Sequence, residues 1–225
     1  MKIVFDASCL ISISQTCLAK CLGRLREKLD SEFIVSPAVY REIVSTPLGI
    51  KRFELNAVRL KGLVEQKSLV VTELDANARE FLAKISFLAN NSFFVKGKPV
   101  KIMHSGELEA LALMKQLDAE ALAIDERTTR ILIENPAALH SSMEERQLAN
   151  VEENKANLRE FQGLFSGCNI LRSSELIALA FETGAVEGEL EKSRLALEAA
   201  LYAAKFSGCS VSIEEIQDYL KNTKL

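Results

Sequence analysis

The segment Lys2-Ile3-Val4-Phe5-Asp6-Ala7-Ser8 decides how the chain can fold, because a short apolar run passes directly into an acidic residue. Its apolar part predicts a buried strand over residues 2–5. Ser8 is a candidate cap for a helix that reaches about residue 29. The segment Ala121-Leu122-Ala123-Ile124-Asp125 repeats the same arrangement of strand and aspartate later in the chain.

Strands and helices alternate along much of the remaining chain. Short apolar runs predict strands at 33–35, 69–71 and 169–171. Helices are expected over 38–45, 48–65, 75–90, 106–117, 127–134, 173–181, 188–206 and 213–222. Residues 90–99 are expected to form a loop, and residues 141–165 a charged helical stretch whose sparse apolar stripe includes Leu148. This alternation predicts an α/β fold with a parallel sheet covered on both faces, and sites in such folds lie at the carboxyl ends of the strands.

The composition indicates a globular protein and excludes several functional classes. The chain has 225 residues, 48% hydrophobic and 26% charged, and its net charge of −3 does not favour a polyanion partner. It has no Gly-Lys-Ser/Thr phosphate loop, no G-x-G-x-x-G fingerprint and no Cys-x-x-Cys pair, and its only histidines are His104 and His140. Five cysteines, no signal peptide and no apolar run of roughly 18 residues make a cytoplasmic location the expectation.

Asp6 and Asp125 each follow a predicted buried strand, a position with two readings. An aspartate there can cap the next helix through the free backbone N–H groups, or it can belong to a functional site. Glu42 and Glu107 lie early in two other predicted helices, where the helix dipole also favours glutamate. Four carboxylates brought together would raise one another's pKa values, and a cation would relieve the repulsion. Because oxygen ligands favour Mg²⁺ or Mn²⁺ over Zn²⁺, the four acids predict a site for one of these ions.

Four blocks of the sequence resemble the PIN domain family in their order and spacing. They are Ile3-Val4-Phe5-Asp6-Ala7-Ser8, Ser36-Pro37-Ala38-Val39-Tyr40-Arg41-Glu42, Gly106-Glu107-Leu108-Glu109-Ala110-Leu111-Ala112-Leu113 and Ala123-Ile124-Asp125-Glu126-Arg127. The resemblance is to prokaryotic members related to the toxin ribonucleases of toxin–antitoxin pairs. It implies a three-layer α/β/α fold with a central parallel sheet, and Mg²⁺- or Mn²⁺-dependent cleavage of phosphodiesters, usually in RNA.

The resemblance also implies roles for individual residues. The metal-binding and catalytic acids would be Asp6, Glu42, Glu107 and Asp125. Ser8 would steady a carboxylate or a metal-bound water. Glu126 stands where the family often has a second aspartate, and would be either a helper of the site or an ordinary helix-start residue.

The same resemblance divides the chain into a PIN-like domain over residues 1–185 and a C-terminal helical extension over residues 186–225. Helical insertions are expected at about 48–90 and 137–166. Because family members of this type are usually shorter, these additions would either shape a substrate groove or cover the site.

Basic residues near two of the acids are candidates for contact with RNA, since a nuclease needs cations to hold the phosphate backbone. They are Lys96, Lys98 and Lys101 ahead of Glu107, and Arg127 and Arg130 after Asp125. In the alternative reading, the lysines are solvated loop residues and the arginines pair with Glu126 and Glu134.

The function predicted from these features is a Mg²⁺- or Mn²⁺-dependent endoribonuclease, a hydrolase in which the four acids hold the metal that activates water. RNA would be its substrate, and the toxin-like resemblance implies an antitoxin-like protein or a second copy of the chain as partner. The alternative is a non-catalytic PIN-like module that binds RNA or a protein. A phosphohydrolase of the haloacid dehalogenase type would need an aspartate two places after Asp6, where Ser8 stands.

Overall fold

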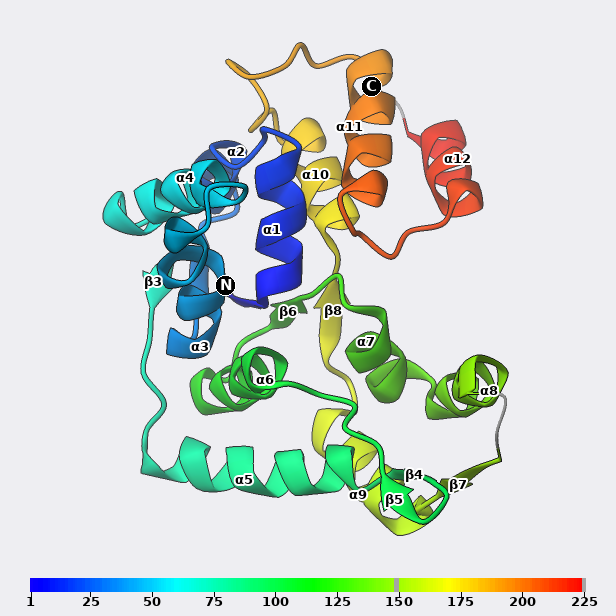
Figure 1. Ribbon diagram of the computed structural model, residues 1–225. Coiled ribbons are helices and arrows are strands. Elements are labelled where there is room, and N and C mark those ends of the chain that lie inside the picture. Colours follow the sequence, from blue (N-terminus) through cyan, green and yellow to red (C-terminus); the bar gives the residue numbers. More distant parts are fainter. Residues whose placement is uncertain (148–149, 224–225) are drawn as a thin grey trace.

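A five-stranded parallel sheet lies at the centre of the computed structural model, which describes residues 1–147 and 150–223 (Figure 1). In spatial order the strands are β3 (Val70–Val71), β2 (Glu32–Val35), β1 (Lys2–Phe5), β6 (Ala121–Ala123) and β8 (Asn169–Leu171). Phe5 pairs with Val35 on one side and with Ala123 on the other, so β1, β2 and β6 end at the same edge. This sheet confirms the predicted parallel arrangement.

Helices cover both faces of the sheet. Side chains of β1 alternate between the two cores, with Ile3 and Phe5 in one and Val4 in the other. The first core includes residues of α1 (Ala7–Gln15), α2 (Cys21–Lys28), α10 (Ser173–Glu182) and α11 (Arg194–Phe206). The second includes residues of α5 (Ala76–Asn90), α6 (Ser105–Leu117), α7 (Arg127–Glu134) and α9 (Lys155–Phe165). The predicted three-layer α/β/α fold is therefore confirmed, and Figure 1 shows its two helical layers on either side of β6 and β8.

The helix expected to reach residue 29 is two helices. α1 ends at Gln15 and α2 begins at Cys21, because Cys17 between them adopts a left-handed conformation with φ of 64°. The N-cap of α1 is Asp6 rather than Ser8, since the Asp6 carboxylate accepts a hydrogen bond from the Ser8 amide.

The segment after β2 winds tightly toward the sheet edge. Ser36 caps α3 (Pro37–Tyr40), as its position before Pro37 predicts. The helix then widens into the π-helical turn η1 (Arg41–Ser45), which carries Glu42, and the 3₁₀ turn η2 (Pro47–Gly49) leads toward α4 (Glu54–Glu65). A π-helical turn of this kind is frequent at functional sites.

A second, antiparallel sheet forms where the sequence predicted a loop over 90–99 and part of a continuous helical stretch over 141–165. β4 (Phe93–Val95) pairs with β5 (Lys98–Pro99) and with β7 (Val151–Glu153), so the loop predicted over 90–99 is a hairpin. Its turn uses positive φ angles at Lys96 and Gly97. The helical stretch predicted over 141–165 is likewise divided by β7 into α8 (Pro136–Gln147) and α9. Leu148, expected in its apolar stripe, lies outside the described residues.

The C-terminal helices pack on the same core as α1. α12 (Ile213–Asn222) forms where a helix over 213–222 was expected, and it begins with a capping box of Ser212 and Glu215. Leu201 of α11 and Ile216 of α12 belong to the core that also contains Leu10. The division of the chain at residue 185 stays a prediction, and residues 224–225 of the extension lie outside the described residues. Within residues 1–147 and 150–223, no helix combines the length and the apolar character needed to cross a membrane.

Candidate functional site

Asp6 lies where β1 ends, and Ser8 connects it to the end of β6. The Asp6 side chain is buried, and its Oδ2 accepts hydrogen bonds from the Ser8 amide at 2.9 Å and the Ser8 hydroxyl at 2.5 Å. The Ser8 Oγ in turn accepts hydrogen bonds from the amides of Asp125 at 3.0 Å and Glu126 at 3.2 Å. One hydroxyl therefore joins the carboxyl ends of two neighbouring strands.

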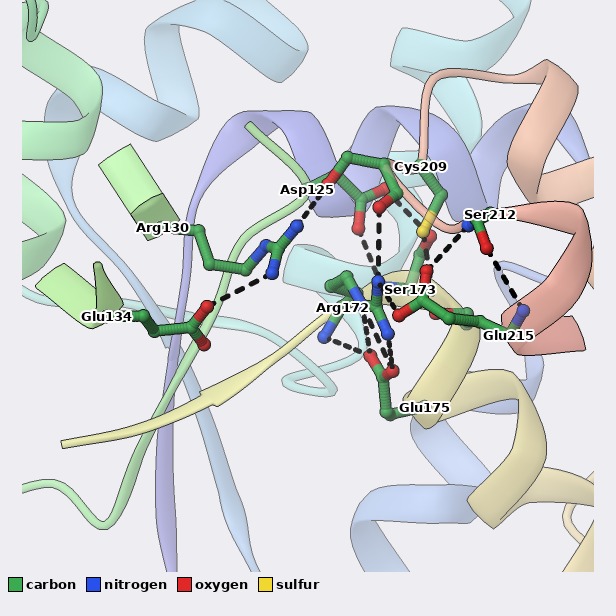
Figure 2. Close-up of polar contacts among 11 residues, drawn as sticks. Asp125, Arg130, Glu134, Arg172, Ser173, Glu175, Cys209, Ser212 and Glu215 are labelled. Atoms are coloured by element: carbon green, nitrogen blue, oxygen red, sulfur yellow. Dashed lines mark hydrogen bonds and ion pairs between the residues drawn. The ribbon is translucent and has the colours of Figure 1, made fainter. Parts of the chain in front are cut away.

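The Asp125 side chain points toward α10. Its Oδ1 accepts a hydrogen bond from the Ser173 amide and its Oδ2 one from the Ser173 hydroxyl, both at 2.7 Å (Figure 2). Asp125 is only 2% exposed, so both of its oxygens are engaged inside the protein. The parallel pairing of β6 with β8 brings Ser173 against Asp125, and the role of Asp125 as a metal-binding acid stays a prediction.

Glu42 reaches the first turn of α6 because Gly106 has no side chain. A Cβ atom on Gly106 would lie 2.7 Å from Oε1 of Glu42 and 3.0 Å from its Oε2. Glu109 holds α3 beside α6, since its Oε2 accepts a hydrogen bond from the Ala38 amide at 2.8 Å and its Oε1 lies 3.7 Å from Arg41. The positive end of the α6 dipole thus faces the Glu42 carboxylate.

Glu107 occupies the first turn of α6 and accepts a hydrogen bond from the His104 amide. Burial raises its pKa from 4.5 to about 7, and the charges of Asp6, Glu126 and Glu42 raise it as well, although the His104 hydrogen bond acts against them. Glu107 therefore lies within electrostatic range of three other acids.

The pKa values of Asp6 and Glu42 are raised as well, again first by burial and then by neighbouring charges. Burial raises the pKa of Asp6, opposed by its hydrogen bonds with Ser8 and reinforced by the charge of Glu126. Burial also raises the pKa of Glu42, reinforced by the charges of Asp6 and Glu109. We call Asp6, Glu42, Glu107 and Glu126 the carboxylate cluster.

Glu126 begins α7 and lies within electrostatic range of two other acids. Its Oε2 accepts a hydrogen bond from the Thr129 amide at 2.6 Å and so caps α7. Its charge also acts on Asp6 and Glu107. Its role as a helper of the site stays a prediction.

The carboxylate cluster offers only oxygen donors, the ligand chemistry that suits Mg²⁺ or Mn²⁺. The Glu42 carboxylate makes no hydrogen bond to the described part of the chain, so both of its oxygens are available. Within that part, however, no three His, Cys, Asp or Glu side chains are grouped closely enough to hold a metal ion. The acids are thus near enough to perturb one another, and binding a cation would require their side chains to converge.

The candidate RNA-contacting residues lie in two places. Lys96, Lys98 and Lys101 are exposed on or after the β4–β5 hairpin, which Figure 1 places beside α9 and away from the start of α1. Arg130 pairs with Glu134 at 3.1 Å, which is the pairing that the alternative reading expects (Figure 2). It also donates a hydrogen bond to the Ser210 hydroxyl at 3.4 Å. Arg127 is exposed. Contact of these five residues with RNA stays a prediction.

Three residues that the sequence reasoning did not assign help to form the site. Ser173 holds Asp125, Gly106 makes room for Glu42, and Glu109 ties α3 to α6. The signal for Ser173 was its place two residues after the last predicted strand, close to the sheet edge at which Asp6 and Asp125 were expected.

Comparison with known protein families agrees with the geometry. A family model described as a PIN domain matches residues 2–135, more than half of the chain. No curated protein and no solved structure gives a significant match. The matched range contains all members of the carboxylate cluster and Asp125, whereas Ser173 lies beyond it. PIN domains are generally modules of the nuclease type and generally use divalent metals. The chain therefore belongs to the PIN domain family.

Proposed function

We propose that this protein is a divalent-metal-dependent endoribonuclease that hydrolyses phosphodiesters in RNA. The observation that carries the proposal is the gathering of Asp6, Glu42 and Glu107 from three separate elements of a PIN domain, where burial and neighbouring carboxylates raise their pKa values. Buried acids that repel one another are typical of a functional site, because a bound cation removes the repulsion.

The residues that would hold Mg²⁺ or Mn²⁺ are Asp6, Glu42 and Glu107, with Glu126 and Asp125 beside them. When bound, such an ion supplies an activated water and neutralises charge on the scissile phosphate. Ser8 fixes the orientation of Asp6 through two hydrogen bonds. Glu107, with a pKa of about 7, holds a proton at Oε1 or Oε2 in part of the molecules at neutral pH, and that proton must leave before the carboxylate can act as a ligand.

Calorimetric titration with Mn²⁺, together with cleavage of single-stranded RNA, tests the proposal. Asp6→Asn keeps a hydrogen-bonding side chain at the cap of α1 and removes the charge, so we expect it to weaken Mn²⁺ binding and to abolish cleavage. Glu80→Gln is a matched control, because Glu80 is an exposed acid on α5. A wild-type protein that neither binds Mn²⁺ nor cleaves RNA or DNA would contradict the proposal.

The second candidate is a non-catalytic module that binds RNA or a protein partner. Two observations favour it: each oxygen of Asp125 accepts a hydrogen bond from Ser173, and the described acids are not grouped closely enough to hold a metal ion. A toxin-like ribonuclease predicts that expression arrests growth and that Asp6→Asn relieves the arrest. A module predicts equal effects of both proteins, and an antitoxin-like partner or a second copy would then be sought by co-purification and by light scattering.

A further inference from the structure

A hollow of about 300 Å³ adjoins the carboxylate cluster on the side of Glu42. Its walls come from α1, η1, η2 and α4, which pack against one another (Figure 1). Glu42 lines the hollow and is also a member of the carboxylate cluster, so the two sites share this side chain. The volume is at the lower end of the range of small-molecule sites, about 300–1,000 Å³.

Apolar side chains on the rim of the hollow are open to solvent. Ile11 is 36% exposed, Ile50 43% and Phe53 42%. They come from α1 and from the segment that leads into α4, so the chain brings them together from separate elements. Exposed apolar groups gathered around a concave surface mark a binding site more often than scattered ones do.

Of the polar side chains in the same walls, the Ser14 hydroxyl donates to the Ile11 carbonyl at 2.8 Å, whereas two amides remain without a partner in the described part of the chain. The side-chain amides of Gln15 and Asn56 have no hydrogen bond to the described part of the chain. Each amide offers both donors and an acceptor. In addition, the Arg52 guanidinium lies 5.5 Å from the centre of the Phe53 ring, which places a positive charge at the outer rim.

We propose that this hollow binds an unpaired nucleobase next to the phosphodiester that the carboxylate cluster cleaves, an inference that rests on the proposed function. The base stacks on Phe53, and the amides of Gln15 and Asn56 bond its polar edge. Arg52 attracts the adjoining phosphate. Aromatic rings and guanidinium groups are the usual platforms for single-stranded bases, and amides can read their edges.

The chemistry of the walls favours a base over an apolar segment of a partner protein. An apolar side chain would fill the space beside Ile11 and Ile50 but would offer no hydrogen-bonding group to the partly buried Asn56 amide, and an unpaired polar group is costly once desolvated. A base has a flat apolar face and a polar edge, which matches both kinds of wall. The hollow also ends at Glu42, so a strand placed at the acids is already beside it.

The test compares variants of the full-length protein on a single-stranded RNA pentanucleotide. Phe53→Ala is expected to raise KM about tenfold and to leave kcat within about twofold, because base–aromatic stacking is lost. Phe53→Tyr restores KM, and Asn56→Ala alters the preference among the four homopolymers. Leu55→Ala is the matched control, since Leu55 is an exposed apolar residue of the same helix outside the hollow. Urea unfolding of each variant verifies its fold.

A second measurement separates this inference from the proposed function. Fluorescence anisotropy reports binding of the same RNA without metal, in the Asp6→Asn protein with and without Phe53→Ala. Binding that depends on Phe53 without cleavage by the wild type would keep the base site and refute the nuclease. Cleavage whose KM is unchanged by Phe53→Ala and Asn56→Ala would keep the nuclease and refute the base site. Absence of both cleavage and Phe53-dependent binding would refute both.

Discussion

Replacing Glu107 by Gln is expected to stabilise the metal-free protein at alkaline pH and to remove its stabilisation by Mn²⁺. The ionised Glu107 carboxylate is unfavourable in the folded state because of burial and of the charges of Asp6, Glu126 and Glu42. Glutamine carries no charge and can still accept the hydrogen bond from the His104 amide, as either residue does in a capping box. The substitution therefore removes the repulsion and keeps the start of α6.

The magnitude follows from the pKa of Glu107. A rise from 4.5 to about 7 favours the protonated form in the folded protein and corresponds to about 3 kcal/mol. Partial exposure of this side chain reduces the expected effect to about 1–2 kcal/mol. Because the pKa is raised on folding, the folded state binds the proton more tightly. The contribution of Glu107 to the free energy of unfolding is therefore most favourable below about pH 4.5, falls as the pH rises to about 7, and is constant above that.

Urea unfolding near pH 5 and near pH 8, with and without Mn²⁺, measures the effect. We expect Glu107→Gln to match the wild type at the lower pH and to exceed its stability at the higher pH without metal. Mn²⁺ should stabilise the wild type by mass action, and the variant much less. Glu80→Gln is the control. Equal stability of Glu107→Gln and wild type near pH 8 would refute the repulsion, and equal stabilisation by Mn²⁺ would refute Glu107 as a ligand.

Three further predictions concern the surroundings of the cluster. Gly106→Ala places a Cβ atom 2.7 Å from Oε1 of Glu42, so the Glu42 carboxylate must move. We expect calorimetry to show a lower Mn²⁺ affinity, while the circular dichroism spectrum stays unchanged. An unaltered affinity would show that Glu42 is not a ligand. Ser173→Ala leaves Oδ2 of the buried Asp125 without its hydroxyl donor and should cost about 1–3 kcal/mol in urea unfolding, which a wild-type midpoint would contradict. Arg172→Met removes ion pairs to Glu175 at 2.6 Å and Glu215 at 3.0 Å and should lower the free energy of unfolding by roughly 2 kcal/mol in urea unfolding. A decrease seen only at low salt would instead mean that these pairs act as surface charges.

The central sheet could be predicted from the sequence because each of its longer strands is an apolar run that ends at a polar residue. The strands at 2–5 and 33–35 and the helix at 127–134 were placed nearly to the residue. The second sheet could not be predicted in this way. Phe93-Phe94-Val95 is short and pairs with residues 151–153, more than fifty positions away, so no local pattern announces the pairing.

The site was predicted less completely than the fold. Motif order singled out Asp6, Glu42 and Glu107, and the structure places their charges within range of one another. The direction of the Asp125 side chain depends on Ser173, which neighbours it only through the pairing of β6 with β8. The break at Cys17 depends on a single backbone angle, and a continuous apolar stripe gives no sign of it.

The position of β8 at the border of the central sheet has a practical consequence. This strand lies beyond residue 135, yet it covers one side of β6 and brings Ser173 to Asp125. A shortened chain that ended with the family match would leave the backbone groups of β6 open on that side, a surface that other chains can extend by strand addition. Such a fragment would also lack Ser173, which donates both of its hydrogen bonds to the Asp125 carboxylate. We therefore expect it to aggregate, so isolated-domain preparations should extend at least through α10.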